Sequence, residues 1–203
     1  MARSGLTAPA MNRDTPIDPD EAKGLIPDLL TQAQLNEYEQ LNIGRAWLWA
    51  RSSRFLKRRL VSRDGLQRLH QRMFDRTWKW AGQFRRSDKT IGVPWTEIPV
   101  EVQKVCDDIL YQLTQQSISL EEIAVRFHHR LVSVHPFPNG NGRHARMTAD
   151  LLCLQHGGKP FPWGASDFAT KSSVRTAYID ALRAADVGDI IPLMKFAAST
   201  HRS

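Results

Sequence analysis

The chain has 203 residues, of which 41% are hydrophobic and 24% charged, as expected for one soluble globular domain with its own core. No apolar run approaches the roughly 18 residues of a membrane span, and the first residues lack the apolar segment of a secretory signal. Cys106 and Cys153 lie far apart, which argues against a disulfide framework or a cysteine zinc site and favours a reducing, cytoplasmic location. The net charge of +7 favours polyanionic partners.

Much of the positive charge lies between residues 51 and 79. Arg68, Arg72 and Arg76 are spaced by four residues, so they share one face of a predicted helix. Such a face is most often simply solvated, and the alternative is a docking surface for an acidic partner. We call these three arginines the basic face.

The N-terminal part predicts a tail followed by helices. Residues 1–24 are rich in Pro and Asp and predict a mobile tail, which leaves residues 25–203 as the domain. Thr31 and Gln34 form a capping box, which predicts that a helix starts at Thr31. Apolar residues follow it at roughly helical spacing, namely Leu35, Tyr38, Leu41 and Leu48. Asp64 is expected to open a second helix.

Residues 80–95 are the only part of the sequence with the features of β-strands. They form short segments that contain β-branched residues and are interrupted by Gly and Pro, and they predict a small β-hairpin. Helices are expected after Pro99, and again from about Glu121 until His135, where Pro136 disfavours a helical residue before it. Further helices are predicted at about 142–155, around 174–182 and after residue 189. The predicted fold is therefore mostly α, a bundle of six or so helices with one small β-hairpin.

The most informative segment is HPFPNGNGRHAR, residues 135–146. Gly140 and Gly142 permit positive φ and close approach of a ligand to the backbone. The N–H groups at the start of the following helix, together with Arg143 and Arg146 on one helical face, predict a site for a polyphosphate. His135 stands at the edge of this loop and has an ordinary pKa suited to proton abstraction.

These residue types together predict phosphoryl or nucleotidyl transfer, in which a base removes a proton from a hydroxyl while arginines and N–H groups hold phosphates. Phe137 is expected to anchor the loop in the core. His144 is expected to be exposed, and Tyr178 fits either an adenine pocket or core packing.

The segment resembles the signature of the Fic (filamentation-induced-by-cAMP) family, H-x-F-x-[DE]-G-N-G-R-x-x-R, at every fixed position except Asn139. The stretch WAGQFR, residues 80–85, is similar to the family's entry to its target-binding hairpin. Gly188 to Leu193 is similar to the family's closing helix. The whole layout, roughly residues 30–198, most resembles the branch called mobile mystery protein B.

The resemblance implies roles for individual residues. His135 would be the catalytic general base, and Gly140, Asn141, Gly142, Arg143 and Arg146 would bind the nucleotide. Residues Lys89, Thr90, Ile91, Gly92 and Val93, which we call the flap, would hold the backbone of a target protein by strand addition. The implied activity is transfer of AMP from ATP to a Tyr, Ser or Thr hydroxyl of that protein.

Asn139 replaces the acid that would hold Mg²⁺ on the phosphates. Mg²⁺ prefers carboxylate oxygens, so the amide is expected to weaken the activity by roughly 10–100-fold. Two alternatives therefore remain: a nucleotide-binding or protein-binding module with little catalysis, and a kinase-like phosphotransferase.

Regulation is expected to come from a partner, because no stretch of the chain matches the family's inhibitory pattern [ST]-x-x-x-E-[GN]. The resemblance implies a protein encoded beside this one, as in toxin–antitoxin pairs. It would either insert a Glu against Arg146 or act as a helix-turn-helix regulator, with the basic face as its contact. Direct binding to nucleic acid or to a membrane is not expected.

Overall fold

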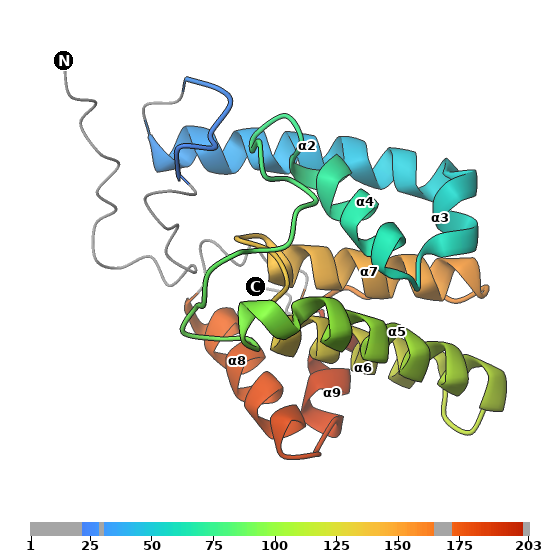
Figure 1. Cartoon of the computed structure of the whole chain (residues 1–203). Coiled ribbons are helices and arrows are strands. Elements are labelled where there is room, and N and C mark those ends of the chain that lie inside the picture. Colours follow the sequence, from blue (N-terminus) through green and yellow to red (C-terminus); the bar gives the residue numbers. More distant parts are fainter. Residues whose placement is uncertain (1–21, 29–30, 165–171, 201–203) are drawn as a thin grey trace.

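The computed structural model describes residues 22–28, 31–164 and 172–200, and these are mostly helical (Figure 1). In chain order the elements are α2 (Gln32–Ser52), α3 (Arg54–Arg59), α4 (Arg63–Phe74), the 3-10 helix η1 (Trp95–Glu97), α5 (Ile98–Gln115), α6 (Leu120–Val134), α7 (Asn141–Gln155), α8 (Ser172–Asp186) and α9 (Ile191–Ala198). The predicted mostly α fold is confirmed. Within the described residues, no helix is both long and apolar enough to cross a membrane.

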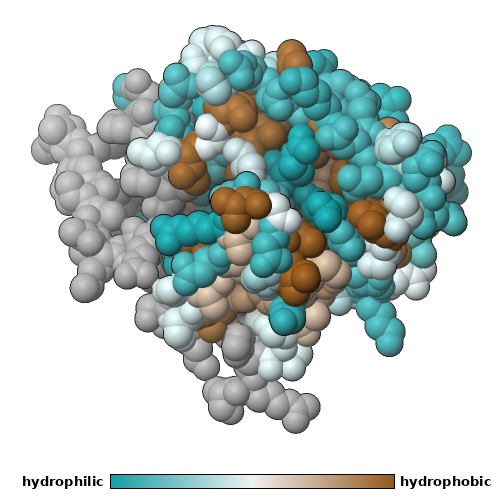
Figure 2. Space-filling view, turned by 90° about the horizontal axis from the view of Figure 1, so that it is seen from below, coloured by the Kyte–Doolittle hydropathy of each residue, from teal (hydrophilic) through white to brown (hydrophobic). Residues whose placement is uncertain are grey.

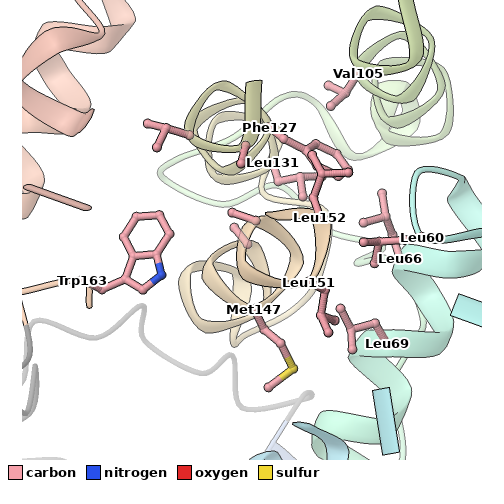
Figure 3. Packing of buried hydrophobic residues seen from close by; sticks show 14 of the residues in the cluster. Leu60, Leu66, Leu69, Val105, Phe127, Leu131, Met147, Leu151, Leu152 and Trp163 are labelled. Carbon is pink, nitrogen blue, oxygen red and sulfur yellow. The ribbon is translucent and has the colours of Figure 1, made fainter. Parts of the chain in front are cut away.

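Helix α7 lies at the centre of the molecule. Helices α2 and α4 pack on one side of it, α6 and α5 on the other, and the α8–α9 pair packs against α6 (Figure 1). Leu151 and Leu152 of α7 face these neighbours, with Leu66 of α4 on one side and Phe127 and Leu131 of α6 on the other (Figure 3). All five side chains are at most 1% exposed. Burying each contributes about 1.5–3 kcal/mol to folding before entropy is counted.

Helix α2 begins as the sequence predicts, but its buried face is not the apolar one. The Thr31 hydroxyl accepts from the Gln34 N–H at 3.2 Å, and the Gln34 side chain accepts from the Thr31 N–H at 3.1 Å. Of the apolar residues at helical spacing, only Leu35 is buried, while Leu41 and Leu48 are 62% and 68% exposed. Besides Leu35, the inward face carries polar and small residues, namely Glu39, Asn42, Ala46 and Ala50. Polar partners on other elements make this burial possible.

The predicted tail, residues 1–24, lies outside the described residues except for its last three. The Gly24 carbonyl accepts from the Lys79 N–H at 2.8 Å, and the Ile26 N–H donates to the Thr77 carbonyl at 2.8 Å. The chain is therefore attached to the turn after α4 from about residue 24 onward. The mobility of residues 1–21 stays a prediction.

The β-hairpin predicted at residues 80–95 is not found as paired strands. The described residues contain only two isolated bridges, Leu25–Trp78 and Gly164–Thr200. Residues 83–94 instead bond to the α6–α7 loop, with Arg85 N–H donating to the Pro136 carbonyl and Val93 N–H to the Val134 carbonyl. Because the two limbs bond to this loop, they do not form a ladder with each other.

The surface has no single large apolar area on the face seen in Figure 2, where hydrophobic residues lie in separate groups among hydrophilic ones. Cys106 and Cys153 are free thiols in the core, as expected from their spacing. Burial raises the pKa of each thiol to about 12, so neither is a reactive thiolate.

Candidate functional site

His135 ends α6 in a left-handed conformation. Its φ is 52°, and its N–H still bonds to the Leu131 carbonyl. The following Pro136 disfavours a right-handed helical conformation here, so the helix does not continue. The side chain is only 4% exposed, and neither imidazole nitrogen has a hydrogen-bond partner among the residues that the structure describes. Burial, followed by the charges of Arg85 and Lys89, lowers the pKa of His135 to about 4. The imidazole is therefore neutral and free to accept a proton at pH 7.

Helix α7 starts six residues after His135. Its N-terminal N–H groups lie beside the loop that begins at His135. Gly140 is its N-cap, with φ of 78°, and it has no side-chain capping bond. His144 is the first residue of α7 whose N–H donates to a main-chain carbonyl, that of Gly140. The N–H groups of Asn141, Gly142 and Arg143 have no acceptor among the described residues. This N-terminus is suited to an anion by its dipole and its donors.

Gly140 is required here for two reasons. Its positive φ is strained for an L side chain, and a Cβ at this position would lie 2.4 Å from the Phe74 ring. Gly142 is different from the sequence expectation, because it is helical rather than at positive φ. A Cβ there would approach only the Tyr178 hydroxyl and Arg146, at 3.8 and 4.0 Å. Gly142 therefore keeps the helix start open rather than making the turn.

The two motif arginines lie one turn apart in α7. The Arg143 guanidinium lies over the Phe74 ring, 5.0 Å from its centroid. Arg146 lies near the Tyr178 ring, at 5.7 Å, and burial lowers its pKa against the opposing effect of Tyr178. Tyr178 is 9% exposed and bonds to His128, so it belongs to the core that supports Arg146. Both arginines are held by aromatic rings beside the helix N-terminus.

Glu39 is a part of this site that the sequence did not reveal. Its carboxylate, on α2, forms an ion pair with Arg143 at 2.5 Å and accepts from the Trp78 indole N–H at 2.7 Å. The Glu39 side chain is only 5% exposed. A carboxylate of this chain thus reaches a motif arginine, and it is the first arginine rather than Arg146. The available signal was the helical spacing of Leu35, Glu39 and Asn42, which places an acid on a buried face.

The loop between His135 and α7 is held by side chains of its own and of α4. The Asn141 side chain accepts from the Phe137 N–H at 2.9 Å and donates to the Phe137 carbonyl at 2.8 Å. His70 of α4 stacks on the Phe137 ring at 3.7 Å, accepts from the Gly82 N–H and bonds to the Asn139 carbonyl. Phe137 is fully buried, as predicted. Asn141 therefore offers a ligand only its backbone N–H.

His144 corrects the expectation that it would be exposed. It is 1% exposed, and its Nε2 bonds to the Leu66 carbonyl at 3.0 Å. Burial lowers its pKa to about 4, so it is a neutral core residue. It lies next to Arg143 in sequence but faces α4, whereas Arg143 faces Glu39.

Asn139 offers little to a metal ion. Its side-chain oxygen accepts a short hydrogen bond from the Gly140 N–H. The described residues contain no group of three or more His, Cys, Asp or Glu side chains that could hold a metal. One neutral oxygen, already hydrogen-bonded, is a poor match for Mg²⁺, which prefers carboxylates and phosphates. The residues present do not form a protein-held Mg²⁺ site.

The flap lies against His135. Val93 bonds through its N–H to Val134, and a Cβ on Gly92 would lie 2.7 Å from the His135 Cβ. Thr90, Ile91 and Gly92 are exposed, and Lys89 and Val93 are partly buried. The structure thus brings together His135, the start of α7, both motif arginines and the flap.

A family model described as Fic/DOC family matches residues 60–153. The protein adenylyltransferase fic-1 of Caenorhabditis elegans is 29% identical over 142 residues, 68% of this chain and 27% of that protein. The protein adenylyltransferase Fic of Nematostella vectensis is 26% identical over 168 residues, 81% of this chain and 38% of that one. The chain thus spans well under half the length of these relatives.

Among solved structures, the N-terminal Fic domain of a Bartonella quintana effector protein with bound ADP is similar in fold. It has a TM-score of 0.63 at 20% identity, over 86% of this chain and 87% of that one. The matched segment of the family model contains α4, the flap, His135 and almost all of α7. Residues 60–153 therefore match the Fic/DOC family model, and the sequence motif and the fold agree with that match.

Proposed function

We propose that this chain transfers AMP from ATP to a hydroxyl group of a target protein. One observation carries the proposal. The neutral imidazole of His135 has no hydrogen-bond partner among the described residues, and it shares a loop with a helix N-terminus that carries two arginines and three N–H groups without an acceptor in this part of the chain. A base for the hydroxyl and a site for the polyphosphate are thereby adjacent. The names of the relatives, which are adenylyltransferases, support the same activity.

The reaction is a substitution at the α-phosphorus of ATP. His135 accepts the hydroxyl proton, the hydroxyl oxygen forms a bond to the α-phosphorus, and the bond to the bridging oxygen breaks, so that pyrophosphate leaves. The N–H groups of Asn141, Gly142 and Arg143 donate to phosphate oxygens, and the guanidiniums of Arg143 and Arg146 offset the charge on the leaving group. No step in this scheme passes through a metal ion.

The low pKa of His135 belongs to the protein without nucleotide. A base with a pKa of about 4 is weak at pH 7, because the best catalytic base has a pKa near the working pH. The phosphates of ATP bring negative charge beside Arg85, Lys89 and the imidazole, which favours the protonated form and raises this pKa. Nucleotide binding therefore raises the pKa of His135 and makes it a stronger base for the transfer.

Labelling with ATP that carries a radioactive α-phosphate tests the proposal. Wild-type protein should label itself or a protein in a cell lysate, and His135→Ala should lower the labelling by about 100-fold or more. His156→Ala is the matched control, because His156 is exposed beyond the end of α7. Equal labelling by wild-type protein and His135→Ala would refute the role of His135 as base.

The kinase-like alternative is separated by the position of the label. AMP transfer retains the α-phosphate label and loses the γ-phosphate label, whereas phosphate transfer does the reverse. Retention of the γ label alone would overturn the proposed reaction. The intact Gly-Asn-Gly-Arg sequence at residues 140–143 favours AMP transfer.

The alternative of a binding module rests on Asn139, whose oxygen is hydrogen-bonded to Gly140 and carries no charge. ATP binding without transfer by the wild-type protein would favour it. Mg²⁺ as a companion of ATP stays a prediction of the family resemblance, and any ion that arrives on the phosphates would find Asn139 as a neutral ligand.

The target protein is proposed to bind along the flap as an added strand. A paired hairpin is not needed for this binding mode, because exposed backbone N–H and C=O groups without partners are sufficient. Thr90 and Ile91 supply such groups, since neither has a hydrogen-bond partner among the described residues. The mobile mystery protein B branch and a cytoplasmic location stay predictions.

A regulatory partner encoded beside this chain is proposed to dock on the basic face. Arg68 and Arg72 line an open groove of about 830 Å³ between α2, α3, α4 and the turn at residues 79–83. Arg72 lies over Trp49, and its Nε has no acceptor. Arg76 is exposed just beyond the end of α4, so the face extends past that helix. Charge complementarity here would favour an acidic partner.

Co-purification with the product of the neighbouring gene tests the partner proposal. We expect a stoichiometric complex that survives moderate salt and is weakened by Arg68→Glu. Arg183→Glu, at an exposed arginine of α8, changes the net charge equally and should leave the complex intact. A chain that purifies alone and is unaffected by its neighbour's product would contradict the proposal.

A further inference from the structure

Arg85 is a buried arginine that the reaction described above does not use. Its side chain is 0% exposed, and its Nη1 lies 3.8 Å from the carboxylate of Asp88, which is itself 71% exposed. Nε donates to the His135 carbonyl at 2.7 Å, Nη1 donates to the Ser87 carbonyl at 2.8 Å, and Nη2 donates to the Val93 carbonyl. A buried charge is tolerated only when such bonds replace water, and three backbone carbonyls supply such bonds to Arg85.

The three acceptors belong to the two segments that the reaction must bring together. Ser87 lies just before the flap, Val93 is the last residue of the flap, and His135 carries the base. One planar guanidinium, with donors in a fixed fork, therefore sets the distances among all three. An ammonium group is a point charge with rotating donors and cannot hold three acceptors in one plane.

Main-chain contacts join the same two segments, the stretch from Arg85 to Val93 and the residues around His135. The Arg85 N–H donates to the Pro136 carbonyl at 3.0 Å, so both the main chain and the side chain of Arg85 hold the residues around the base. Gly92, with φ of 100°, passes so close that a Cβ would lie 2.7 Å from the His135 Cβ and 2.8 Å from Arg85 Nη2. His135 itself is left-handed, a conformation that persists only when its surroundings hold it.

We propose that Arg85 is a positioning residue that fixes the flap relative to His135, and so places the hydroxyl of a flap-bound target at the base. The inference rests on the proposed function of His135. It assigns Arg85 to target placement and not to the nucleotide, whose arginines, Arg143 and Arg146, lie on α7. Loss of Arg85 should therefore disturb the placement of the target hydroxyl and leave ATP binding unchanged.

The first test does not depend on activity. Hydrogen exchange of the Val93 amide, which bonds to Val134, should be at least 10-fold faster in Arg85→Met and faster in Arg85→Lys, which keeps the charge but not the fork. Exchange of α7 amides should not change. Arg86→Met is the matched control, because Arg86 is the exposed neighbour with no partner among the described residues. Unchanged exchange at Val93 in Arg85→Met would overturn the proposal.

The second test measures binding and transfer separately. In Arg85→Lys the dissociation constant for ATP should stay within about 2-fold of wild type, while transfer of the α-label to protein falls at least 10-fold. Gly92→Ala should reproduce this result with Arg85 intact, because its Cβ pushes the flap off His135. It also keeps the proposal testable if Arg85→Met does not fold.

The outcomes distinguish the two proposals. If wild-type protein transfers nothing, the proposed function fails, and the hydrogen-exchange measurement alone then tests whether Arg85 fixes the flap. If wild-type protein transfers AMP and Arg85→Lys does so with equal efficiency, the positioning role is refuted and the proposed function stands. An equal loss of ATP binding and transfer in Arg85→Lys would also refute it, because that pattern indicates a role in the nucleotide site.

Discussion

Glu39 and Arg143 form an ion pair that places a carboxylate at the phosphate site. Their side chains are 104 residues apart in sequence and join α2 to α7. The carboxylate occupies one edge of a guanidinium that would otherwise be entirely available to a phosphate. It also places a negative charge beside a site for a polyanion, which opposes ATP binding.

Glu39→Gln should therefore tighten ATP binding. The amide removes the negative charge but keeps an oxygen for the Trp78 indole N–H, and a gain of about 1 kcal/mol, or several-fold in the dissociation constant, is the scale expected for one partly screened charge. Titration of a fluorescent ATP analogue measures it.

Trp78→Phe is the control for Glu39→Gln, since it removes the indole donor and leaves the charge in place. It should leave the dissociation constant unchanged. Weaker binding in Glu39→Gln would show instead that the carboxylate serves mainly to orient Arg143.

Asn139→Asp should create the metal ligand that the wild-type loop lacks. A carboxylate has the same shape as the amide and can still accept from the Gly140 N–H, but it adds the charge that Mg²⁺ prefers. We expect Mg²⁺-dependent AMP transfer to rise by about 10-fold or more. Labelling rates of both proteins across a Mg²⁺ titration provide the measurement.

Asn139→Ala separates charge from shape in that experiment, because it removes the oxygen altogether. If neither Asn139→Asp nor wild-type protein transfers AMP while both bind ATP, the binding-module alternative is correct.

At the scale of elements, local sequence determines where α2 begins, and tertiary contacts determine which of its faces is buried. The capping box at Thr31 follows from four residues of sequence, and it sets where the helix begins. Which face of α2 turns inward depends on Trp78, Arg143 and the backbone after α4. The face with Glu39 and Asn42 is buried because those partners satisfy its polar groups, while Leu41 and Leu48 remain exposed.

Thr31→Ala should lower the free energy of unfolding by about 1 kcal/mol, because it leaves the Gln34 N–H without its acceptor. Urea denaturation followed by circular dichroism measures this change. Thr31→Ser keeps the hydroxyl and should cost much less. Equal losses in the two variants would show that the methyl group, and not the cap, is responsible.

At the scale of the whole molecule, buried histidines dominate the expected response to acid. Burial is the main cause that lowers the pKa of His135 and His144 to about 4, and it also lowers those of His70 and His128. The unfolded chain then binds more protons than the folded chain between about pH 6.5 and pH 4. Asp150 acts in the opposite sense, because burial raises its pKa to about 6.

Stability should therefore fall as the pH falls from 6.5 towards 4, since several histidines outweigh one aspartate. Each histidine contributes a slope of up to about 1.4 kcal/mol per pH unit in this window. Thermal unfolding should show a midpoint about 5–10 °C lower at pH 5 than at pH 7.5.

His144→Gln tests the assignment of this slope, because it removes one titrating group and should make the dependence on pH shallower. A midpoint that is constant or rises on acidification would contradict the prediction.

The sequence alone determined the features that depend on neighbours along the chain. The helix end at His135, the cap at Thr31, the loop from 135 to 146 and the mostly α fold follow from Pro, Gly and capping residues and from helical periodicity. The motif also assigned the two arginines to one side of α7. Gly142 was placed wrongly at positive φ, because one glycine, Gly140, already makes the turn.

Only the tertiary structure decided which distant groups meet. Glu39 reaches Arg143, Arg85 reaches the His135 carbonyl, and His70 reaches the Asn139 carbonyl, across 104, 50 and 69 residues. The burial of His144 and the bonding of the flap to the α6–α7 loop belong to the same class. Periodicity shows which residues share a face of a helix, but the partner that makes burial of a polar face favourable is supplied by another element, and that choice depends on how all the helices pack.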